Sequence, residues 1–444
     1  MDDFRLVADA VEAEIRSGRL AAGDRLLPQR EFARHRGMAV STAARVYREL
    51  VSRGLVAGEV GRGTYVLPGG SRPPTGPATS GIVDLEANFP VLPGQAEMMA
   101  PTMARLLHSP SFAASLEPVP AAGTAEARSA TARFLSRRDW TPAPDRVLFT
   151  GSGRQAIAAA IAALVPPGGR LGVEELTYPV VKAIAARLGV TLVPIRMDEH
   201  GLEPTDLRES HRRDPLGAVY LQPTLHNPLG ITMPDRRRDQ IRDLLGELDL
   251  IAIEDGVNAY LARQALPLAA TAGHRTVYVD SLTKQIAPGL SLGVVVAPPG
   301  LDAELAASIR SGPWPATGFA LAATSALMDD GTAARIVAAK QADASARQRI
   351  AAERLAGFDV SADPDSYHCW WRLPDRWRTD TFVAAAARHG ISVSPGAAFA
   401  VDPQQVPNAI RIAVSAPDLP GLAAALDTLA GLARARPEDT GPAY

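Results

Sequence analysis

The sequence contains very little cysteine and lysine. Cys369 is the only cysteine in 444 residues, which excludes a disulfide framework and zinc sites built from thiolates. The eight histidines form no cluster with the spacing of metal ligands, so we expect no metal site. Among the 46 basic residues the only lysines are Lys182, Lys284 and Lys340, which confines the search for a reactive amine to these three positions.

Long hydrophobic runs and a strong net charge are also absent. No run approaches the roughly 18 apolar residues of a membrane-spanning helix, and the acidic start Met1-Asp2-Asp3 is unlike a signal peptide. We therefore expect a cytoplasmic protein with no membrane partner. The formal net charge is only −2, so a surface that binds nucleic acid must be local. The chain is too long for one hydrophobic core, which predicts at least two domains.

Residues 1–67 have the pattern of a small helical domain. Apolar residues recur at helical spacing between positions 4 and 15, which predicts one amphipathic helix. Pro28 starts a short second helix, and a third is expected over residues 40–53. The turn Gly61-Arg62-Gly63 lies between two apolar runs and predicts a two-stranded ribbon. Helix, turn, helix and ribbon in this order predict a winged helix-turn-helix.

The same region carries a local positive charge. Seven arginines stand against two glutamates between Arg25 and Arg53, an excess of 7 − 2 = 5 positive charges on an otherwise neutral chain. A patch of this kind suits the phosphate backbone of DNA. On an isolated helix pair, such a basic patch is as often a solvent-exposed surface as a DNA-binding one. Here the ordered series of helices and ribbon favours DNA binding.

These residues resemble the GntR family of regulators over about residues 4–67. The matching text is Leu20-x-x-Gly23-x-Arg25-Leu26, Arg30-x-x-Ala33, Gly37, Thr42, Tyr47-x-x-Leu50-x-x-x-Gly54-Leu55 and Gly61-Arg62-Gly63-Thr64-Tyr65-Val66. The resemblance implies that the third helix enters the major groove of a double-stranded DNA operator. It assigns DNA contacts to Arg30, Ser41, Thr42, Arg45, Arg62 and Gly63. Ala39, Val40 and Ala44 depart from the family pattern, which affects the bases that are read.

Residues 68–81 are dense in proline and glycine and predict a linker. From residue 82 to 444, short apolar runs alternate with helical stretches rich in alanine and leucine, which predicts an α/β domain with a doubly wound sheet. Ligands of such sheets bind at the C-terminal ends of the strands. The expected strands are residues 147–149, 171–173, 218–221, 250–253, 277–279 and 294–296.

Polar residues follow several of these predicted strands. The turn Gly151-Ser152-Gly153-Arg154 leads into a helix and predicts a cradle for an anion. Pyridoxal 5′-phosphate (PLP) needs such a cradle together with an amine for a Schiff base, a carboxylate at the ring nitrogen, an amide at the phenolic oxygen and an aromatic ring for stacking. Each residue alone is common after a strand, but the ordered set favours PLP. The candidates are Gly153, Arg154, Lys284, Asp255, Asn227, Tyr178 and Ser281.

This region resembles the fold type I aminotransferases over roughly residues 85–435, and its combination with the first domain resembles the MocR subfamily of GntR regulators. The matching text is Tyr178-Pro179, Asn227-Pro228-x-Gly230, Asp255, Lys284-x-x-x-Pro288-Gly289-Leu290-x-x-Gly293, Pro395-Gly396-x-x-Phe399 and Ile410-Arg411-Ile412. The resemblance implies a small C-terminal α+β subdomain at about residues 335–435. It also implies a head-to-tail homodimer, and it assigns the carboxylate of a substrate or effector to Arg411.

Two positions depart from the aminotransferase pattern. Val257 stands where a tyrosine normally helps to hold the phenolic oxygen, and Ser291 stands where an arginine normally binds the phosphate. The loss of the tyrosine and the arginine affects catalytic turnover more than the occupancy of the site by PLP. We therefore predict a PLP-dependent transcription regulator that senses a small amino compound by aldimine exchange at Lys284. A working aminotransferase with an attached DNA-binding domain is the alternative, and a regulator whose second domain has lost PLP is a third possibility.

Overall fold

The computed structural model describes residues 3–16, 19–20, 24–52, 55–59, 63–66, 82–262, 264–312 and 315–437. The chain divides into two compact units. One contains residues 1–84, 373–393 and 424–444, and the other contains residues 85–372 and 394–423. The predicted linker, residues 68–81, lies outside the described residues, so the domain boundaries drawn from the sequence stay predictions.

The N-terminal residues form three helices, as the periodicity predicts. These are α1 (Asp3–Arg16), α2 (Gln29–His35) and α3 (Val40–Ser52). Gly37 ends the α2 turn with a φ of 65°, a conformation that costs glycine little. Apolar side chains spaced three and four residues apart, including Val11 and Val46, point into one shared core.

The sheet of this domain differs from its prediction. The strands β1 (Arg25–Leu26), β2 (Val56–Glu59) and β3 (Gly63–Val66) form a three-stranded antiparallel sheet in the order β1-β3-β2. The expected two-stranded ribbon is present as the antiparallel pair β2 and β3, and β1 adds a third strand that was not predicted. A strand of two residues is too short to show an alternating pattern, so β1 could not be recognised from the sequence.

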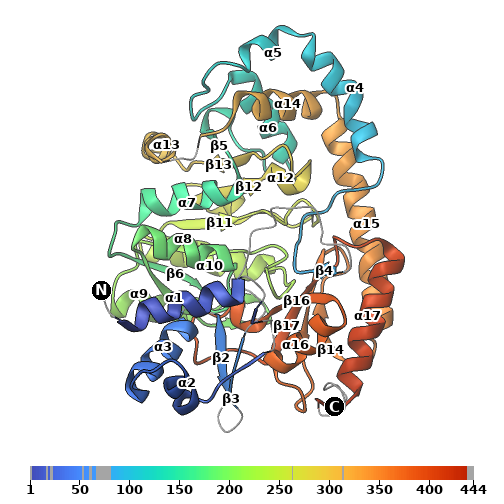
Figure 1. Ribbon diagram of the computed structural model, residues 1–444. Helices are drawn as coiled ribbons and strands as arrows, with labels where there is room; N and C mark the ends of the chain where they lie inside the picture. Colours follow the sequence, from blue (N-terminus) through green and yellow to red (C-terminus); the bar gives the residue numbers. More distant parts are fainter. Residues whose placement is uncertain are drawn as a thin grey trace. The chain divides into compact units, whose positions relative to one another are not determined.

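A mixed seven-stranded sheet forms the centre of the larger unit (Figure 1), in the order β5-β13-β12-β11-β10-β6-β7. Strand β13 is antiparallel to both of its neighbours, and the other pairs are parallel. The strands are β5 (Val147–Thr150), β6 (Arg170–Glu174), β7 (Thr191–Ile195), β10 (Ala218–Leu221), β11 (Ala252–Asp255), β12 (Thr276–Ser281) and β13 (Gly293–Val296). The six predicted strands are all present. The pattern missed β7, and β11 begins two residues later than predicted.

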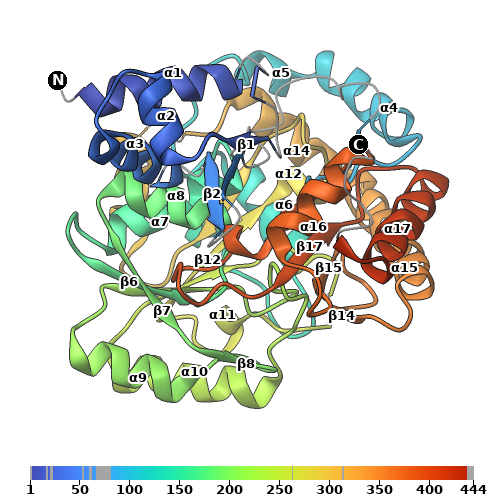
Figure 2. The same ribbon diagram turned by 60° about the horizontal axis from the view of Figure 1, so that its bottom comes forward.

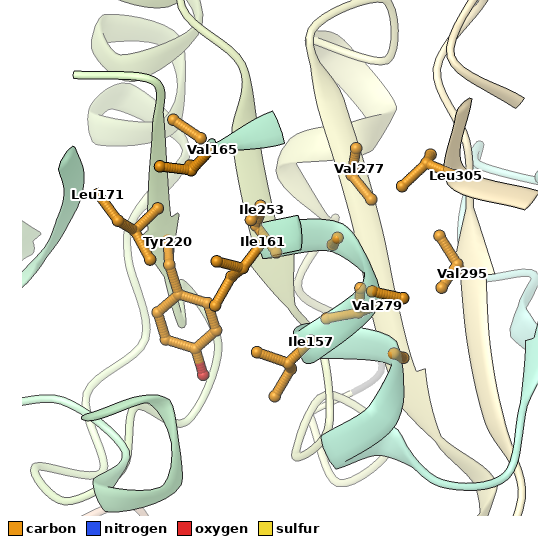
Figure 3. Close-up of a cluster of buried hydrophobic side chains, with 14 of the residues drawn as sticks. Ile157, Ile161, Val165, Leu171, Tyr220, Ile253, Val277, Val279, Val295 and Leu305 are labelled. Carbon is orange, nitrogen blue, oxygen red and sulfur yellow. The ribbon is translucent and has the colours of Figure 1, made fainter. Parts of the chain in front are cut away.

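Helices cover both faces of this sheet. Ala218 and Tyr220 point into one core with α7 (Gly153–Leu164) and α8 (Pro179–Leu188), and Figure 3 shows Ile157 and Ile161 of α7 beside the Tyr220 ring. The alternate residues Val219 and Leu221 point into a second core. That core includes α9 (Pro204–Arg213), α10 (Asp235–Glu247) and α11 (Leu268–Thr271), and Figure 2 shows α9 and α10 along this face.

A second sheet has the order β14-β15-β17-β16-β4. Its strands are β4 (Val83–Leu85), β14 (Asp359–Ala362), β15 (His368–Arg372), β16 (Ile391–Pro395) and β17 (Ala409–Ala413), and a hairpin of β8 (Met197–Asp198) and β9 (Gly201–Leu202) lies apart. The other helices are α4 (Gln95–Leu107), α5 (Pro110–Ala114), α6 (Ala125–Leu135), α12 (Leu282–Gln285), α13 (Asp302–Ser311), α14 (Gly318–Asp329), α15 (Thr332–Arg354), α16 (Thr379–Arg388) and α17 (Leu419–Arg434), with 3₁₀ turns η1 (Pro144–Arg146) and η2 (Gly396–Ala398). No helix in the described part of the chain combines the length and the apolar character needed to span a bilayer.

Candidate functional site

The C-terminal ends of the central strands bring the predicted cofactor residues to one edge of the sheet. Tyr178 follows β6, Asn227 follows β10, and Asp255 is the last residue of β11. Ser281 ends β12, and Lys284 lies on the one-turn helix α12 that continues from it. The sequence predicted Lys284 at the end of a strand, whereas in the structure it lies one short helical turn after β12. Because these strands are parallel, their C-terminal ends share one edge.

Asp255 is buried, and three donors bind its carboxylate. Its Oδ2 accepts hydrogen bonds from the Tyr220 hydroxyl (2.6 Å) and Gln222 Nε2 (2.8 Å), and its Oδ1 accepts one from the Val257 backbone N–H (3.0 Å). Burial raises the pKa of Asp255, and these three donors together with Lys284 oppose the rise. A carboxylate has about four acceptor sites, so these bonds leave Oδ1 able to accept one more.

Lys284 lies partly buried beside Asn258. Its Nζ donates to Asn258 Oδ1 across 3.4 Å. Burial lowers the pKa of Lys284 to about 8, opposed by the negative charge of Asp255 and assisted by the positive charges of Arg411 and Arg154. A lysine with this pKa has a substantial neutral fraction near neutral pH, which a nucleophilic amine requires.

Arg411 and Asn227 lie together on the other side of the site. Arg411 is on β17 with only 7% of its surface exposed, and its guanidinium donates to Asn227 Oδ1 (3.3 Å), Ser394 Oγ (3.0 Å) and the Glu86 carbonyl. The guanidinium also lies 5.3 Å from the centre of the Phe399 ring. These contacts fix a planar cation next to the amide that the sequence assigned to the phenolic oxygen.

The glycine-rich turn packs closely against the end of β12. A Cβ atom added at Gly153 would lie 2.5 Å from Ser281 Cβ and 2.9 Å from Ser281 Oγ, so only glycine allows this approach. The Ser152 side chain accepts from the Gln155 backbone N–H and caps the start of α7. The predicted anion cradle therefore consists of a helix N-terminus with the Ser281 hydroxyl beside it.

Two positions near the predicted phosphate site are Ser291, where the family has a cation, and Arg154 in the glycine-rich turn. Ser291, which replaces an arginine, donates from its Oγ to the Gly151 carbonyl (2.7 Å) and braces the turn. Arg154 is exposed, and its Nε donates to the Tyr178 hydroxyl across 3.2 Å. Burial raises the pKa of Tyr178, and Arg154 opposes this rise. Arg154 thus links the cradle to the predicted stacking ring.

Sequence reasoning missed Tyr220, Gln222 and Asn258. Gln222 joins two predicted residues, because its Nε2 donates to Asp255 while its Oε1 accepts from the Asn227 backbone N–H (3.1 Å). Tyr220 and Gln222 are two residues apart at the end of β10, so the strand period of two places them on one face. This spacing of two could have identified Tyr220 and Gln222 from the sequence.

Acidic and histidine side chains elsewhere in the described residues do not suggest a metal centre. No group of three or more His, Cys, Asp or Glu side chains there is arranged to hold a metal ion. The one cysteine, Cys369, is buried, and burial raises the pKa of its thiol to about 12. Its thiolate is therefore scarce at neutral pH.

The predicted DNA contacts lie on the helix pair of the first domain. Arg30 is exposed in the first turn of α2, and Ser41 and the half-buried Thr42 lie in the first turn of α3. The Arg45 guanidinium is stacked 4.1 Å from the centre of the Phe4 ring, so part of its role is to join α3 to α1. Arg62 lies outside the described residues, and Gly63 is the first residue of β3.

A buried aromatic pair fixes α2 against α3. The Phe32 and Tyr47 rings meet edge to face with their centres 5.2 Å apart. The Tyr47 hydroxyl donates to the Leu27 carbonyl just before α2, and burial raises the pKa of Tyr47 to about 12. The two helices that carry the predicted DNA contacts are thus held together as a rigid pair.

Comparison with protein families finds two matches. Residues 81–429 match the model of the family described as "Aminotransferase class I and II". Residues 5–66 match the model described as "Bacterial regulatory proteins, gntR family". The two matches cover the two regions that the sequence assigned to a transferase fold and to a DNA-binding domain.

The chain is similar to proteins named as transcription regulators and, in fold, to solved aminotransferases. The chain is 26% identical over 425 residues to the uncharacterized HTH-type transcriptional regulator YdeF of Bacillus subtilis, covering 93% of this chain and 90% of that protein. It is 24% identical to the vitamin B6 salvage pathway transcriptional repressor PtsJ of Salmonella typhimurium, covering 89% and 90%. A Pyrococcus horikoshii kynurenine aminotransferase, solved with PMP, superposes with a TM-score of 0.72 at 21% identity, covering 80% and 91%. The predicted fold class and the predicted pair of domains are confirmed.

Proposed function

Because the chain belongs to the aminotransferase class I and II family and begins with a gntR-type domain, we propose that it is a PLP-dependent transcription regulator. The first domain binds a double-stranded DNA operator, and the second binds PLP. The observation that carries the cofactor assignment is the buried Asp255 carboxylate, which holds three donors and has one acceptor site left near Lys284.

The residues at the sheet edge fit PLP in their charges and in their hydrogen-bonding groups. When bound, PLP supplies an aldehyde that condenses with an amine and a pyridinium ring that withdraws electrons. Asp255 would keep the ring nitrogen protonated, and Asn227 would donate to the phenolic oxygen. Tyr178 would stack on the ring, and Lys284 would supply the amine. The phosphate would bind at the N-terminus of α7, where Gly153 is the first residue, and the close packing of Gly153 against Ser281 puts the Ser281 hydroxyl beside this helix end.

The effector is a small amino compound with a carboxylate. Arg411 would bind this carboxylate through charge-assisted hydrogen bonds, and Lys284 would be the amine whose place at the cofactor the effector's amine takes. Arg411 is held beside Asn227 before any effector arrives, so the carboxylate and cofactor positions are coupled. The relative PtsJ is named as a transcriptional repressor of the vitamin B6 salvage pathway, which supports a regulator whose second domain binds a B6 compound such as PLP.

The protein acts as a homodimer whose two DNA-binding domains read two half-sites. In a head-to-tail arrangement of the transferase domains, the cofactor site of each copy lies near the interface with the other copy. Chemical crosslinking and light scattering of the full chain at micromolar concentration test this arrangement, and a monomer under those conditions would contradict it.

An aminotransferase with an attached DNA-binding domain is the second candidate. Arg411 and the low pKa of Lys284 favour it, whereas Val257 and Ser291, in place of the family's tyrosine and arginine, disfavour it. Amino transfer that depends on an added keto acid would support the enzyme. A footprint upstream of a neighbouring operon, without such transfer, would support the regulator.

The cofactor assignment is tested by reduction of the PLP-loaded chain with borohydride, followed by peptide mapping. We expect the adduct on Lys284 and none in Lys284→Ala, whose violet absorbance should also be lost. Lys182 and Lys340 are natural controls in the same sample. An adduct on either of them, or no adduct in the wild type, would overturn the assignment.

A further inference from the structure

Two of the chain's three lysines, Lys284 and Lys340, are in direct contact. The sequence uses arginine almost everywhere, yet Lys340 lies on α15 with none of its surface exposed. Its Nζ donates to the main-chain carbonyl of Lys284 (2.8 Å) and to that of Ile286 (3.0 Å). A buried lysine thus binds the backbone of the very residue that we assign to the cofactor.

The Lys284 carbonyl needs a donor from outside its own helix. In a continuing α-helix it would accept from the N–H four residues later, but that residue is Pro288, which has no N–H. Helix α12 itself ends at Gln285. Lys340 therefore supplies the donor that proline withholds. The Ile286 carbonyl also accepts from Gln95 Nε2 (2.9 Å), so the loss of Lys340 would fall mainly on Lys284.

The site suits an amine better than a guanidinium. The two carbonyls match the two N–H bonds that an amine keeps even when neutral, so the contact survives the titration of Lys340. A guanidinium carries five N–H donors in a plane, and it would bring several donors without acceptors into a fully buried position. This explains why a chain so rich in arginine has a lysine here.

We propose that Lys340 is a positioning residue that fixes the backbone of Lys284 to α15 and so holds its amine inside the cofactor site. The proposal rests on the proposed function in assigning Lys284 to PLP. The Tyr367 hydroxyl, which lies just before β15, is 2.8 Å from the Lys340 carbonyl and 2.8 Å from Asp343 Oδ2. Its single proton is shared between these two acceptors of α15, which holds this turn of the helix in place.

The test measures how fast acetic anhydride modifies Lys284 in the apoprotein as a function of pH, followed by mass spectrometry. Only the neutral amine reacts, so the midpoint reports the pKa, which is about 8 in the wild type. In Lys340→Met the freed α12 should let Lys284 reach water. The midpoint should then rise by about one unit toward that of an exposed lysine, and modification at pH 8 should slow about fivefold.

Lys182→Met is the matched control. Lys182 Nζ likewise donates to main-chain carbonyls, those of Ala398 (2.9 Å) and Ala400 (2.7 Å), but these lie away from Lys284 in the sequence and on another segment. This variant should lower the thermal unfolding midpoint without moving the Lys284 pH midpoint. If Lys340→Met behaves in the same way, Lys340 has a merely structural role and the proposal is wrong.

Lys340→Arg keeps a cation and most of the side-chain volume, and it carries the test if Lys340→Met does not fold. We expect its Lys284 midpoint to rise as well, and a wild-type midpoint would contradict the requirement for an amine. The two proposals can fail separately. A wild type that takes up no PLP overturns the proposed function, while modification of the apoprotein still measures what Lys340 does.

Discussion

The two candidate sites of this chain are built in opposite ways. The predicted DNA contacts Arg30 and Ser41 are exposed and lie on different helices. At the cofactor site, Asp255 and Asn227 are buried and share the partner Gln222. An exposed cation acts on a phosphate largely alone, whereas removal of a buried group leaves its partners without hydrogen bonds. The comparison predicts independent effects at the first site and coupled effects at the second.

The largest effect is expected from Asp255→Asn. It removes the charge that pairs with the ring nitrogen, and PLP affinity should fall by about 1.5–3 kcal/mol, or one to two decades. Gln222→Leu should also weaken binding, because it leaves both Asp255 and the Asn227 backbone short of a partner. Equilibrium PLP titrations of the single and double variants should give a coupling energy of about 0.5–3 kcal/mol. Additive effects of the two substitutions would contradict the coupling expected at the cofactor site.

A tenfold effect in the opposite direction is expected at the phosphate end. Ser291→Arg returns a cation to the position where the family has one, and it should tighten PLP by about 1.4 kcal/mol. If Arg154 already serves the phosphate, the added arginine meets a like charge and affinity should stay level or fall. In that case Arg154→Ala alone should be severe. If neither substitution changes PLP affinity, we have placed the phosphate incorrectly.

Changes in the pKa of Lys284 offer a smaller effect with a definite sign. The negative charge of Asp255 stabilises the ammonium, so Asp255→Asn should lower the midpoint below 8, by about one unit. The positive charge of Arg411 destabilises it, so Arg411→Met should raise the midpoint. Both shifts are measured as the pH midpoint of PLP capture by the neutral amine, followed by absorbance over about pH 6–10. Shifts of the same sign would contradict the arrangement.

The smallest effects are expected on the DNA side. Arg30→Ala should weaken binding to specific and unrelated duplexes alike and reduce the slope of log K against log salt by about one unit. Thr42→Ala should change the preference between duplexes and leave the slope unaltered. The double variant should be additive within about 0.5 kcal/mol in filter-binding or anisotropy titrations. A strong coupling between the two positions would show that this surface is as interlocked as the cofactor site.

The sequence predicted the fold well where patterns are local. The six predicted strands and the helix pair follow from apolar runs and glycine or proline boundaries. It missed the strand β1, whose two residues carry no period. It also missed Gln222 and Lys340, because their roles depend on which backbone groups fold beside them. The pairing of Arg411 with Asn227 joins residues 184 positions apart, which no spacing rule detects.

We propose that this chain couples DNA binding to the binding of PLP at Lys284. The most direct test of this coupling is a DNA titration of the apoprotein and the PLP-loaded protein on duplex from upstream of its own gene, at one fixed salt concentration. We predict that loading changes the DNA dissociation constant at least about fivefold, and that DNA changes the PLP dissociation constant by the same factor. Lys284→Ala should abolish the change. Equal DNA affinity with and without covalently bound PLP would contradict the account.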